Sequence, residues 1–287
     1  MKIQQSVLFD APGPKAQRRI LATNVLGTIL FLGAAAFVLK GLNDQGQLEA
    51  ELWRPFLTAD VWQFTILPGL MNTFKAAAAA IVTSVIFGLM FGVGRLATNR
   101  AVRWLCGIVV EFFRAVPVLL MMIFFWLLLG RLQVVEPADT PFFAVVLALT
   151  LYNGSVIAEL VRSGVYGLPK GQREAGMAIG MTRGQSLRNI ELPQALVAML
   201  PSLISQFVVI LKDSALGSII TYSELLRGMQ IYGSAGPILQ ALTVAAVLFI
   251  IVNFALSWVA QKLSGLLSSR TSGKTRPVSV PTLVAKV

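Results

Sequence analysis

The sequence contains no histidine and a single cysteine, Cys106, among its 287 residues. One cysteine cannot form a disulfide within the chain, and metal sites built from cysteine and histidine are excluded. No stretch matches the G-x4-G-K-[ST] pattern of a phosphate-binding loop, so the chain has no recognisable ATP site of its own. Charged residues make up only 13% of the chain, against about 25% in a soluble domain. Together with a mean hydropathy of +0.75, this scarcity of charge predicts a membrane protein.

The short alternating strands of a membrane β-barrel are also absent, whereas long apolar runs are present. A bilayer core takes about 20 apolar residues per helix. Five runs have at least about this length: 20–39, 76–94, 140–158, 192–211 and 228–261. A sixth, 115–130, reaches it once its apolar N-terminal flank is included. They predict an all-α integral membrane protein with about six transmembrane helices. The first run follows positive residues, as in a signal peptide, but it is longer than the roughly 7–15 apolar residues of such a segment, which favours an uncleaved helix.

The formal net charge of +11 could indicate nucleic-acid binding, but its distribution argues against that. Seventeen Lys and Arg residues lie in four segments that we assign to the cytoplasm: up to residue 19, 95–103, 162–191 and from 262 onward. The opposite side holds only four, together with seven acidic residues. Cytoplasmic loops of membrane proteins carry such an excess of positive residues. The basicity therefore predicts a multi-pass protein with both termini in the cytoplasm, in contact with membrane lipid and without a nucleic-acid partner.

Residues 170–193 form a polar strip between two apolar runs and read as two short helices. Ala175, Ala178 and Ile179 would share one small apolar face of the first helix. Gly180 is placed to end that helix in a left-handed conformation. Thr182 and Gln185 have the spacing of a capping box that would start the second helix. Pro193 disfavours helical geometry at Leu192 and so predicts a boundary there. From these features alone, a capped connector without further function remains open.

The same strip resembles the E-A-A-x3-G-x9-I-x-L-P signature of permease subunits in bacterial ABC importers. The matching positions are Glu174, Ala175, Gly180, Ile190, Leu192 and Pro193, with Gly176 in place of the second alanine. The resemblance implies that these seven residues belong to a coupling loop, spanning 163–193, that docks into a cytoplasmic ATPase subunit. Glu174 would face basic groups of the ATPase, and Gly180 would form the bend.

Further motifs resemble the polar amino acid branch of these permeases, the branch for histidine, glutamine and glutamate. They are the stretch 68–73, the E-x-x-R-x-x-P-x-L block 111–119, the Y-x6-E-x2-R pattern of Tyr152, Glu159 and Arg162, Gly171-Gln172, and the block 211–216. The resemblance implies a five-helix permease domain over 66–262. Before it lie a cytoplasmic tail, 1–19, and an extra transmembrane helix with an external linker, 20–65; a basic cytoplasmic tail follows, 263–287. The N-terminal extension is most similar to that of actinobacterial glutamate permeases.

The resemblance also implies the partners. The chain would work in the bacterial inner membrane as the permease of an ATP-driven importer for a polar amino acid, with glutamate favoured. It would pair with a second, homologous permease, with a homodimer left open, and with two cytoplasmic ATP-binding subunits and an external solute-binding protein. ATP and magnesium would bind to the ATPase, and the chain would hold no cofactor and perform no covalent chemistry.

Charged residues within the apolar segments are the candidates for the substrate path, because a charge at the bilayer centre costs about 2.5–3.5 kcal/mol on insertion scales. Glu111 with Arg114, and Glu159 with Arg162, have i,i+3 spacing and would lie at the cytoplasmic boundary or face a wet cavity. Lys212 cannot be paired by its neighbour on the same helix and needs a partner from elsewhere. The candidate path residues are Arg114, Tyr152, Glu159, Lys212, Asp213 and Ser214.

Two other classes of protein are weighed against this interpretation. A self-contained secondary amino acid carrier would use intramembrane acids as proton sites, and such carriers often contain internal repeats, which we do not find. A bare channel would not need the long, asymmetric cytoplasmic loop.

Overall fold

The computed structural model describes residues 13–271, and these are almost entirely helical, with no strand in that range. The chain divides into two compact units, Met1–Pro55 and Phe56–Val287. The predicted tails 1–19 and 263–287 fall largely outside the described residues. Residues 14–19 of the predicted N-terminal tail are helical, because α1 already begins at Pro14. Proline suits the first turn of a helix, where its missing N–H has no partner to lose.

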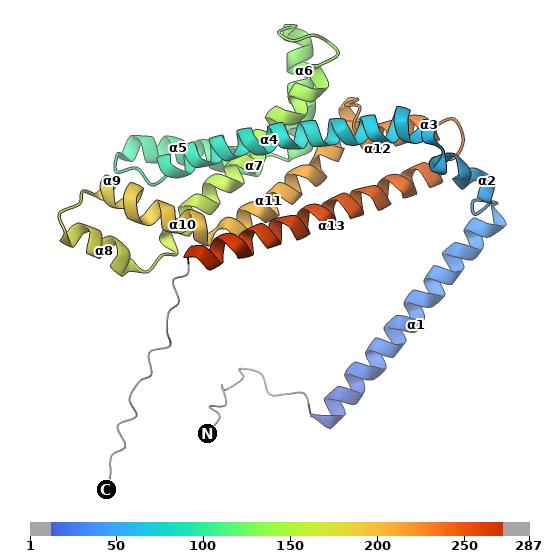
Figure 1. The fold of residues 1–287 in the computed structure, drawn as a ribbon, viewed down its shortest axis with the longest axis horizontal. Helices are drawn as coiled ribbons and strands as arrows, with labels where there is room; N and C mark the ends of the chain where they lie inside the picture. Colours follow the sequence, from blue (N-terminus) through green and yellow to red (C-terminus); the bar gives the residue numbers. More distant parts are fainter. Residues whose placement is uncertain (1–12, 272–287) are drawn as a thin grey trace. The chain divides into compact units, whose positions relative to one another are not determined.

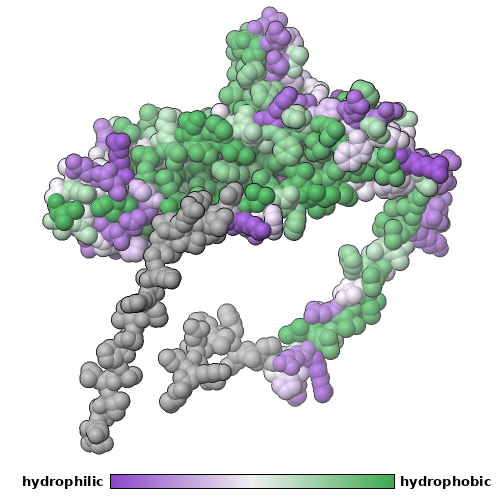
Figure 2. All heavy atoms as spheres, viewed as in Figure 1, coloured by the Kyte–Doolittle hydropathy of each residue, from purple (hydrophilic) through white to green (hydrophobic). Residues whose placement is uncertain are grey.

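The smaller unit consists of α1 (Pro14–Asp44) and the short helix α2 (Ala50–Trp53). At 1.5 Å per residue, the 31 residues of α1 extend over about 46 Å, enough to cross a bilayer. None of its residues is buried in the structure. Its middle is hydrophobic and its two ends are hydrophilic (Figure 2), as expected of a transmembrane helix whose apolar side chains face lipid.

The larger unit begins at Phe56, so that the last part of the predicted linker belongs to it. Phe56 is buried and its ring lies 5.5 Å from that of Tyr232. The elements of this unit follow along the chain (Figure 1). They are η1 (Arg54–Leu57), α3 (Ala59–Val61), the π-helix η2 (Trp62–Ile66), α4 (Leu67–Gly94), α5 (Arg100–Ala115), α6 (Val118–Leu132), α7 (Thr140–Tyr166), α8 (Lys170–Ala178), α9 (Arg183–Ser186), the π-helix η3 (Leu187–Glu191), α10 (Leu192–Ala198), α11 (Leu200–Asp213), the 3-10 helix η4 (Ser214–Ile220), α12 (Leu225–Gly233) and α13 (Ile238–Thr271).

Helices α4 and α7 form the centre of the larger unit. Small residues let them approach closely: a Cβ atom on Gly88 would lie 2.4 Å from Cγ2 of Ile157, and one on Gly154 would lie 2.7 Å from Phe87. Close approach through small residues is how transmembrane helices gain packing energy, because lipid supplies no hydrophobic drive between them. The main apolar core lies further along the same two helices, at Ala76 and Ala80 of α4 and at Ala144 and Leu149 of α7, and is completed by Met121 and Met122 of α6 and by Ile210 of α11.

Five helical segments are long and apolar enough to cross a membrane, and the bent pair α5 and α6 can supply a sixth. The prediction of an all-α protein with about six transmembrane helices is confirmed. The predicted run 115–130 is not one straight helix, however, because α5 and α6 meet at 99°. Pro117 explains the break: the residue before a proline avoids helical geometry, and Val116 is extended, with φ −83° and ψ 129°.

Two other predicted runs are also divided in the structure. The run 192–211 breaks between α10 and α11 at Met199, and the apolar span runs on as Leu200–Ile220. The run 228–261 breaks at Pro237, so that α12 is a separate short helix and α13 begins at Ile238.

The larger unit has two ends with different elements. Elements α8 and α9 lie at one end, and α3 and α12 lie at the other (Figure 1). Hydrophilic side chains gather at both ends, and hydrophobic ones cover the middle (Figure 2).

Candidate functional site

The segment from α8 to α10 contains the predicted coupling motif. Helix α8 ends at Ala178 and is followed by Gly180, whose φ of +85° is the left-handed conformation that the sequence predicts. The N–H of Gly180 donates to the carbonyl of Met177 at 3.0 Å, and that of Met181 donates to Gly176 at 3.1 Å. These two bonds are the pattern of a Schellman cap. They turn the chain sharply between α8 and α9.

The capping box predicted for the second helix is also confirmed. The Thr182 hydroxyl accepts from the N–H of Gln185, and the Gln185 side chain accepts from the N–H of Thr182 at 2.8 Å. The boundary predicted at Leu192 was wrong, because Leu192 is helical, with φ −64° and ψ −45°. The preceding turn, η3, is a π-helix. The wider turn leaves room for the pyrrolidine ring of Pro193, which has no N–H to donate to that turn.

The two arms of the loop pack against each other through Gly176. A Cβ atom at Gly176 would lie 2.9 Å from Cδ1 of Ile190 and 3.1 Å from the hydroxyl of Ser186. Next to this contact the carboxylate of Glu191, which is only 4% exposed, pairs with Arg183 and accepts a hydrogen bond from Ser186 at 2.9 Å. Of the motif residues, Gly176 and Ile190 therefore hold the loop together. The family motif usually has alanine at this position, but here Ile190 and Ser186 leave no room for a side chain larger than that of glycine.

The outer face of α8 is free of contacts within the unit. Glu174, Ala175 and Ala178 are exposed, as are Met177 at 55% and Ile179 at 74%. No ion pair to Glu174 occurs among residues 13–271. An exposed patch of small and apolar side chains around one acid is typical of a surface that another protein covers.

A second cluster of charges lies further along α7 and is here called the arginine cluster: Arg95, Glu111, Arg114, Glu159 and Arg162. Glu159 is its centre, with oxygens 2.5 Å from Arg162, 2.8 Å from Arg95 and 3.8 Å from Arg114. Glu111 lies 2.9 Å from Arg95 and 3.3 Å from Arg114. The two i,i+3 pairs that the sequence predicts separately therefore form one network.

Arg95 is the member of the arginine cluster that the sequence analysis missed. It lies in the link between α4 and α5, and in the sequence it stands out only as one of the three basic residues that assign this link to the cytoplasm. Its side chain is 11% exposed, less than that of either acid to which it binds. A basic residue directly at the end of an apolar run was the only available signal, and such residues more often lie at the lipid surface.

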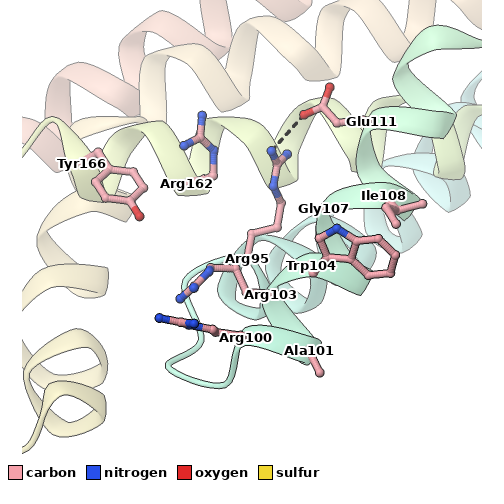
Figure 3. A pocket seen from close by; sticks show the side chains of 10 residues that line it. All are labelled: Arg95, Arg100, Ala101, Arg103, Trp104, Gly107, Ile108, Glu111, Arg162 and Tyr166. Carbon is pink, nitrogen blue, oxygen red and sulfur yellow. Dashed lines mark hydrogen bonds and ion pairs between the residues drawn. The ribbon is translucent and has the colours of Figure 1, made fainter.

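The arginine cluster borders an open cleft of about 840 Å³ at the α8 end of the unit (Figure 3). Arg100, Arg103 and Trp104 line it from α5, and Arg162 and Tyr166 line it from α7. The Arg162 guanidinium lies 5.5 Å from the centre of the Tyr166 ring. One member of each predicted pair, Glu111 and Arg162, therefore lines an open cleft at the end of the unit that holds the predicted coupling loop.

The remaining path candidates do not join this cluster. Lys212 is exposed on α11 and has no ion-pair partner within the described part of the chain. Asp213 is half-buried, and the buried Ser214 hydroxyl donates to the Leu211 carbonyl at 2.7 Å. Tyr152 is half-buried against the main apolar core. The structure thus brings together Arg114 and Glu159, and leaves Tyr152, Lys212, Asp213 and Ser214 outside the arginine cluster.

Comparison with known proteins shows which family the chain matches. Residues 84–265 match the family of binding-protein-dependent transport system inner membrane components. The chain is 44% identical over 241 residues to the glutamate transport system permease protein GluD of Corynebacterium glutamicum, covering 84% of this chain and 88% of that one. It is 30% identical to the glutamate/aspartate import permease protein GltK of Escherichia coli, covering 72% and 93%.

Solved structures agree. An amino acid ABC transporter crystallised with histidines is matched with a TM-score of 0.63 and 27% identity, over 71% of this chain and 93% of that one. The inward-facing MetNI methionine transporter is matched with a TM-score of 0.64 at 19% identity, which supports the fold. The sequence motif of 174–193, the five- to six-span helical bundle and these matches lead to one conclusion: the chain is a membrane-spanning member of the binding-protein-dependent ABC transport permeases.

Proposed function

We propose that this permease serves an ATP-driven importer whose substrate is glutamate. The observation that carries the proposal is the 44% identity, over 84% of the chain, to a permease named for glutamate transport. A second relative is named for glutamate and aspartate import. Relatives named for glutamine and arginine transport share 32% and 29% identity, about as much as the second relative and well below the 44% of the first.

Coupling to ATP hydrolysis is assigned to the loop between α7 and α10. Glu174 and Ala175 lie on the exposed face of α8, where an ATPase subunit would bind, and Gly180 fixes the turn behind that face. Gly176 and Ile190 join the two arms, while Leu192 and Pro193 lead into the next span. Because α7 runs into α8 with only three residues between them, a displacement of α8 would be transmitted directly to α7.

The partners follow the same proposal. Two cytoplasmic subunits would bind ATP and magnesium, so that this chain carries no nucleotide or other cofactor and catalyses no covalent step. An external solute-binding protein would deliver glutamate. A second, homologous permease would complete the substrate path, opposite the exposed Lys212 and its neighbours Asp213 and Ser214. Arg114, Tyr152 and Glu159 would line the path on this chain.

The substrate assignment is tested by reconstituting the whole transporter in liposomes with its second permease, ATPase and solute-binding protein. We expect ATP-dependent uptake of glutamate at least about tenfold faster than uptake of glutamine or arginine. One charge-assisted contact to the acidic side chain is worth about 1.5–3 kcal/mol, which suffices for that ratio. An ATPase variant that cannot hydrolyse ATP is the control. Faster uptake of glutamine or arginine than of glutamate would refute the assignment.

Both termini are proposed to lie in the cytoplasm, as the distribution of Lys and Arg indicates. In a Cys106→Ala background, single cysteines at the exposed positions Asp44 and Ala138 should react with a membrane-impermeant maleimide added to intact cells. Single cysteines at the exposed positions Asn99 and Gly171 should react only after the membrane is broken. Labelling of position 44 only after breakage would mean that α1 has the opposite orientation.

A further inference from the structure

A second cleft lies at the end of the larger unit opposite α8. Its volume is about 400 Å³, within the range of about 300–1,000 Å³ of pockets for small molecules. Its polar lining residues come from three elements that are distant in the sequence. They are Asn72 and Lys75 of α4, Asp139 before α7, and Thr221, Tyr222 and Ser223 of the loop after η4. We call it the Lys75–Asp139 cleft.

The two charged groups of this cleft are opposite in sign and do not neutralise each other. Lys75 and Asp139 are both exposed, and neither takes part in an ion pair within the described residues. They are therefore separated by more than the 4 Å of a salt bridge while lining the same space. A molecule that carries both a carboxylate and an ammonium group could satisfy both at once.

The loop that forms the third wall is held in place by hydrogen bonds to α4. The Tyr222 hydroxyl donates to the Asn72 carbonyl at 2.7 Å, and the Asn72 side-chain amide donates to the Ser223 carbonyl at 2.8 Å. A further bond joins the N–H of Leu225 to the Thr73 hydroxyl at 3.2 Å. The cleft is thus formed before any ligand binds, which reduces the ordering that binding would require.

Thr221 is the residue of this loop whose backbone is strained. Its φ is +65°, a conformation that glycine adopts readily and a β-branched residue does not. The N–H of Thr221 donates to Ser218 and that of Tyr222 donates to Gly217 at 3.0 Å, as at a helix end where glycine is usual. Strain of this kind is concentrated at binding sites. The exposed Thr221 side chain lines the cleft. Glycine would adopt this backbone conformation at a lower cost, but it would supply no hydroxyl group to the cleft.

We propose that the Lys75–Asp139 cleft binds the substrate as an α-amino acid at the end of the permease opposite the coupling loop, before it enters the membrane path. Lys75 binds a carboxylate, Asp139 binds the α-ammonium group, and the hydroxyls of Thr221 and Ser223 contact the remaining oxygens. The inference rests on the proposed function, because it takes amino acid import as given. It differs from the coupling and path assignments in the residues that it uses.

The direct test measures binding of radiolabelled glutamate to the complete transporter in nanodiscs, without solute-binding protein and without ATP. We expect saturable binding that is weakened roughly ten- to hundredfold by Lys75→Gln and by Asp139→Asn, since each substitution removes one charge-assisted contact. Lys75→Arg should retain most of the affinity. Thr221→Gly should also weaken binding, although it relieves the strained backbone, so that loss of folding cannot explain its effect.

Two matched controls lie outside the cleft. Lys40→Gln removes a lysine from the smaller unit, and Glu136→Gln removes an exposed acid from the same loop as Asp139. Both should leave binding unchanged. Absence of saturable binding to the wild-type transporter, or unchanged affinity in Lys75→Gln and Asp139→Asn, would overturn the inference.

Uptake by the same variants separates this site from its alternatives. We expect Lys75→Gln and Asp139→Asn to lower glutamate uptake at least tenfold while the affinity of the transporter for solute-binding protein stays the same. If that affinity falls instead and direct glutamate binding is unchanged, the cleft is a docking surface for the solute-binding protein and the inference fails. Failure of the proposed function has a different outcome, because the wild-type transporter would then import no glutamate at all.

Discussion

Replacement of Glu159 by glutamine is expected to reduce ATP-driven uptake by at least about tenfold. The Glu159 carboxylate binds Arg95 and Arg162 directly and lies near Arg114, so one neutralised side chain weakens three ion pairs. Hydrogen bonds to charged groups contribute about 1.5–3 kcal/mol each, and Arg162 donates two of them to Glu159. Arg95, at 11% exposed, has little water to replace its ion pair with Glu159. We expect ATP hydrolysis by the complex to fall less than uptake.

The reason for this uncoupling is the position of Glu159. It lies on α7, the helix that leads to α8, and pairs with Arg162 of the same helix. Its other two arginine partners, Arg95 and Arg114, lie on the α4–α5 link and at the end of α5. The end of α5 is also the point where the chain bends by 99° into α6. We infer that the arginine cluster transmits movement of α7 to that bend. Weakening the cluster would leave the motor intact while its movement no longer reaches the substrate path.

The matched control is Glu111→Gln. Glu111 also pairs with Arg95 and Arg114, but its side chain is 58% exposed, and exposed ion pairs contribute only about 0–1 kcal/mol. Uptake should therefore fall by less than about fivefold. Equal losses in the two variants, or full uptake with Glu159→Gln at normal assembly of the complex, would contradict a central role for Glu159.

The local features that the sequence predicted best depend on neighbouring residues. The left-handed Gly180 and the Thr182–Gln185 capping box each follow from a few adjacent positions, and both are present in the structure. The number of spans was predictable because apolar length is set by bilayer thickness. The boundaries of the spans were less predictable, because Pro117 and Pro237 interrupt runs that remain apolar on both sides.

Contacts between distant segments could not be predicted in this way. The i,i+3 spacing of Glu111 with Arg114 and of Glu159 with Arg162 is visible in the sequence, but the meeting of these pairs depends on the packing of α5 against α7. Arg95 joins them from a third segment. The same applies to Lys75 and Asp139, which line one cleft because α4 packs against α7. Lys212, singled out for its isolation in an apolar run, is exposed and lies outside both groups.

Family membership also decides between the classes of transporter left open by the sequence. A self-contained carrier would not need an exposed α8, whereas a permease that depends on a separate ATPase does. The exposed acid Glu174 and the apolar Met177 and Ile179 on that helix are unexplained in an isolated chain. They are accounted for if another subunit covers them.

The second large effect is expected from changes on and behind α8. Glu174→Lys reverses the charge of an exposed residue without a partner among residues 13–271, so it should not disturb the fold. It should nevertheless abolish or strongly reduce uptake, because like charges placed opposite each other in an interface cost several kcal/mol. Co-purification of the ATPase subunits with the permease measures the loss of docking directly. Glu136→Lys, at an exposed acid in a different loop, is the control and should leave docking unchanged.

Gly180→Leu acts on the same interface through the backbone. No atom lies within 4 Å of a Cβ at this position, so the substitution meets no steric clash, but a φ of +85° costs a leucine about 1–2 kcal/mol. The strain should shift the turn and rotate α8 away from its docking geometry, lowering uptake at least about tenfold while the permease still inserts and assembles. Gly180→Asn tests this reason, because asparagine tolerates the left-handed conformation, and it should restore most of the uptake. If Glu174→Lys and Gly180→Leu both transport normally at wild-type expression, α8 is not the contact through which ATP hydrolysis drives this permease.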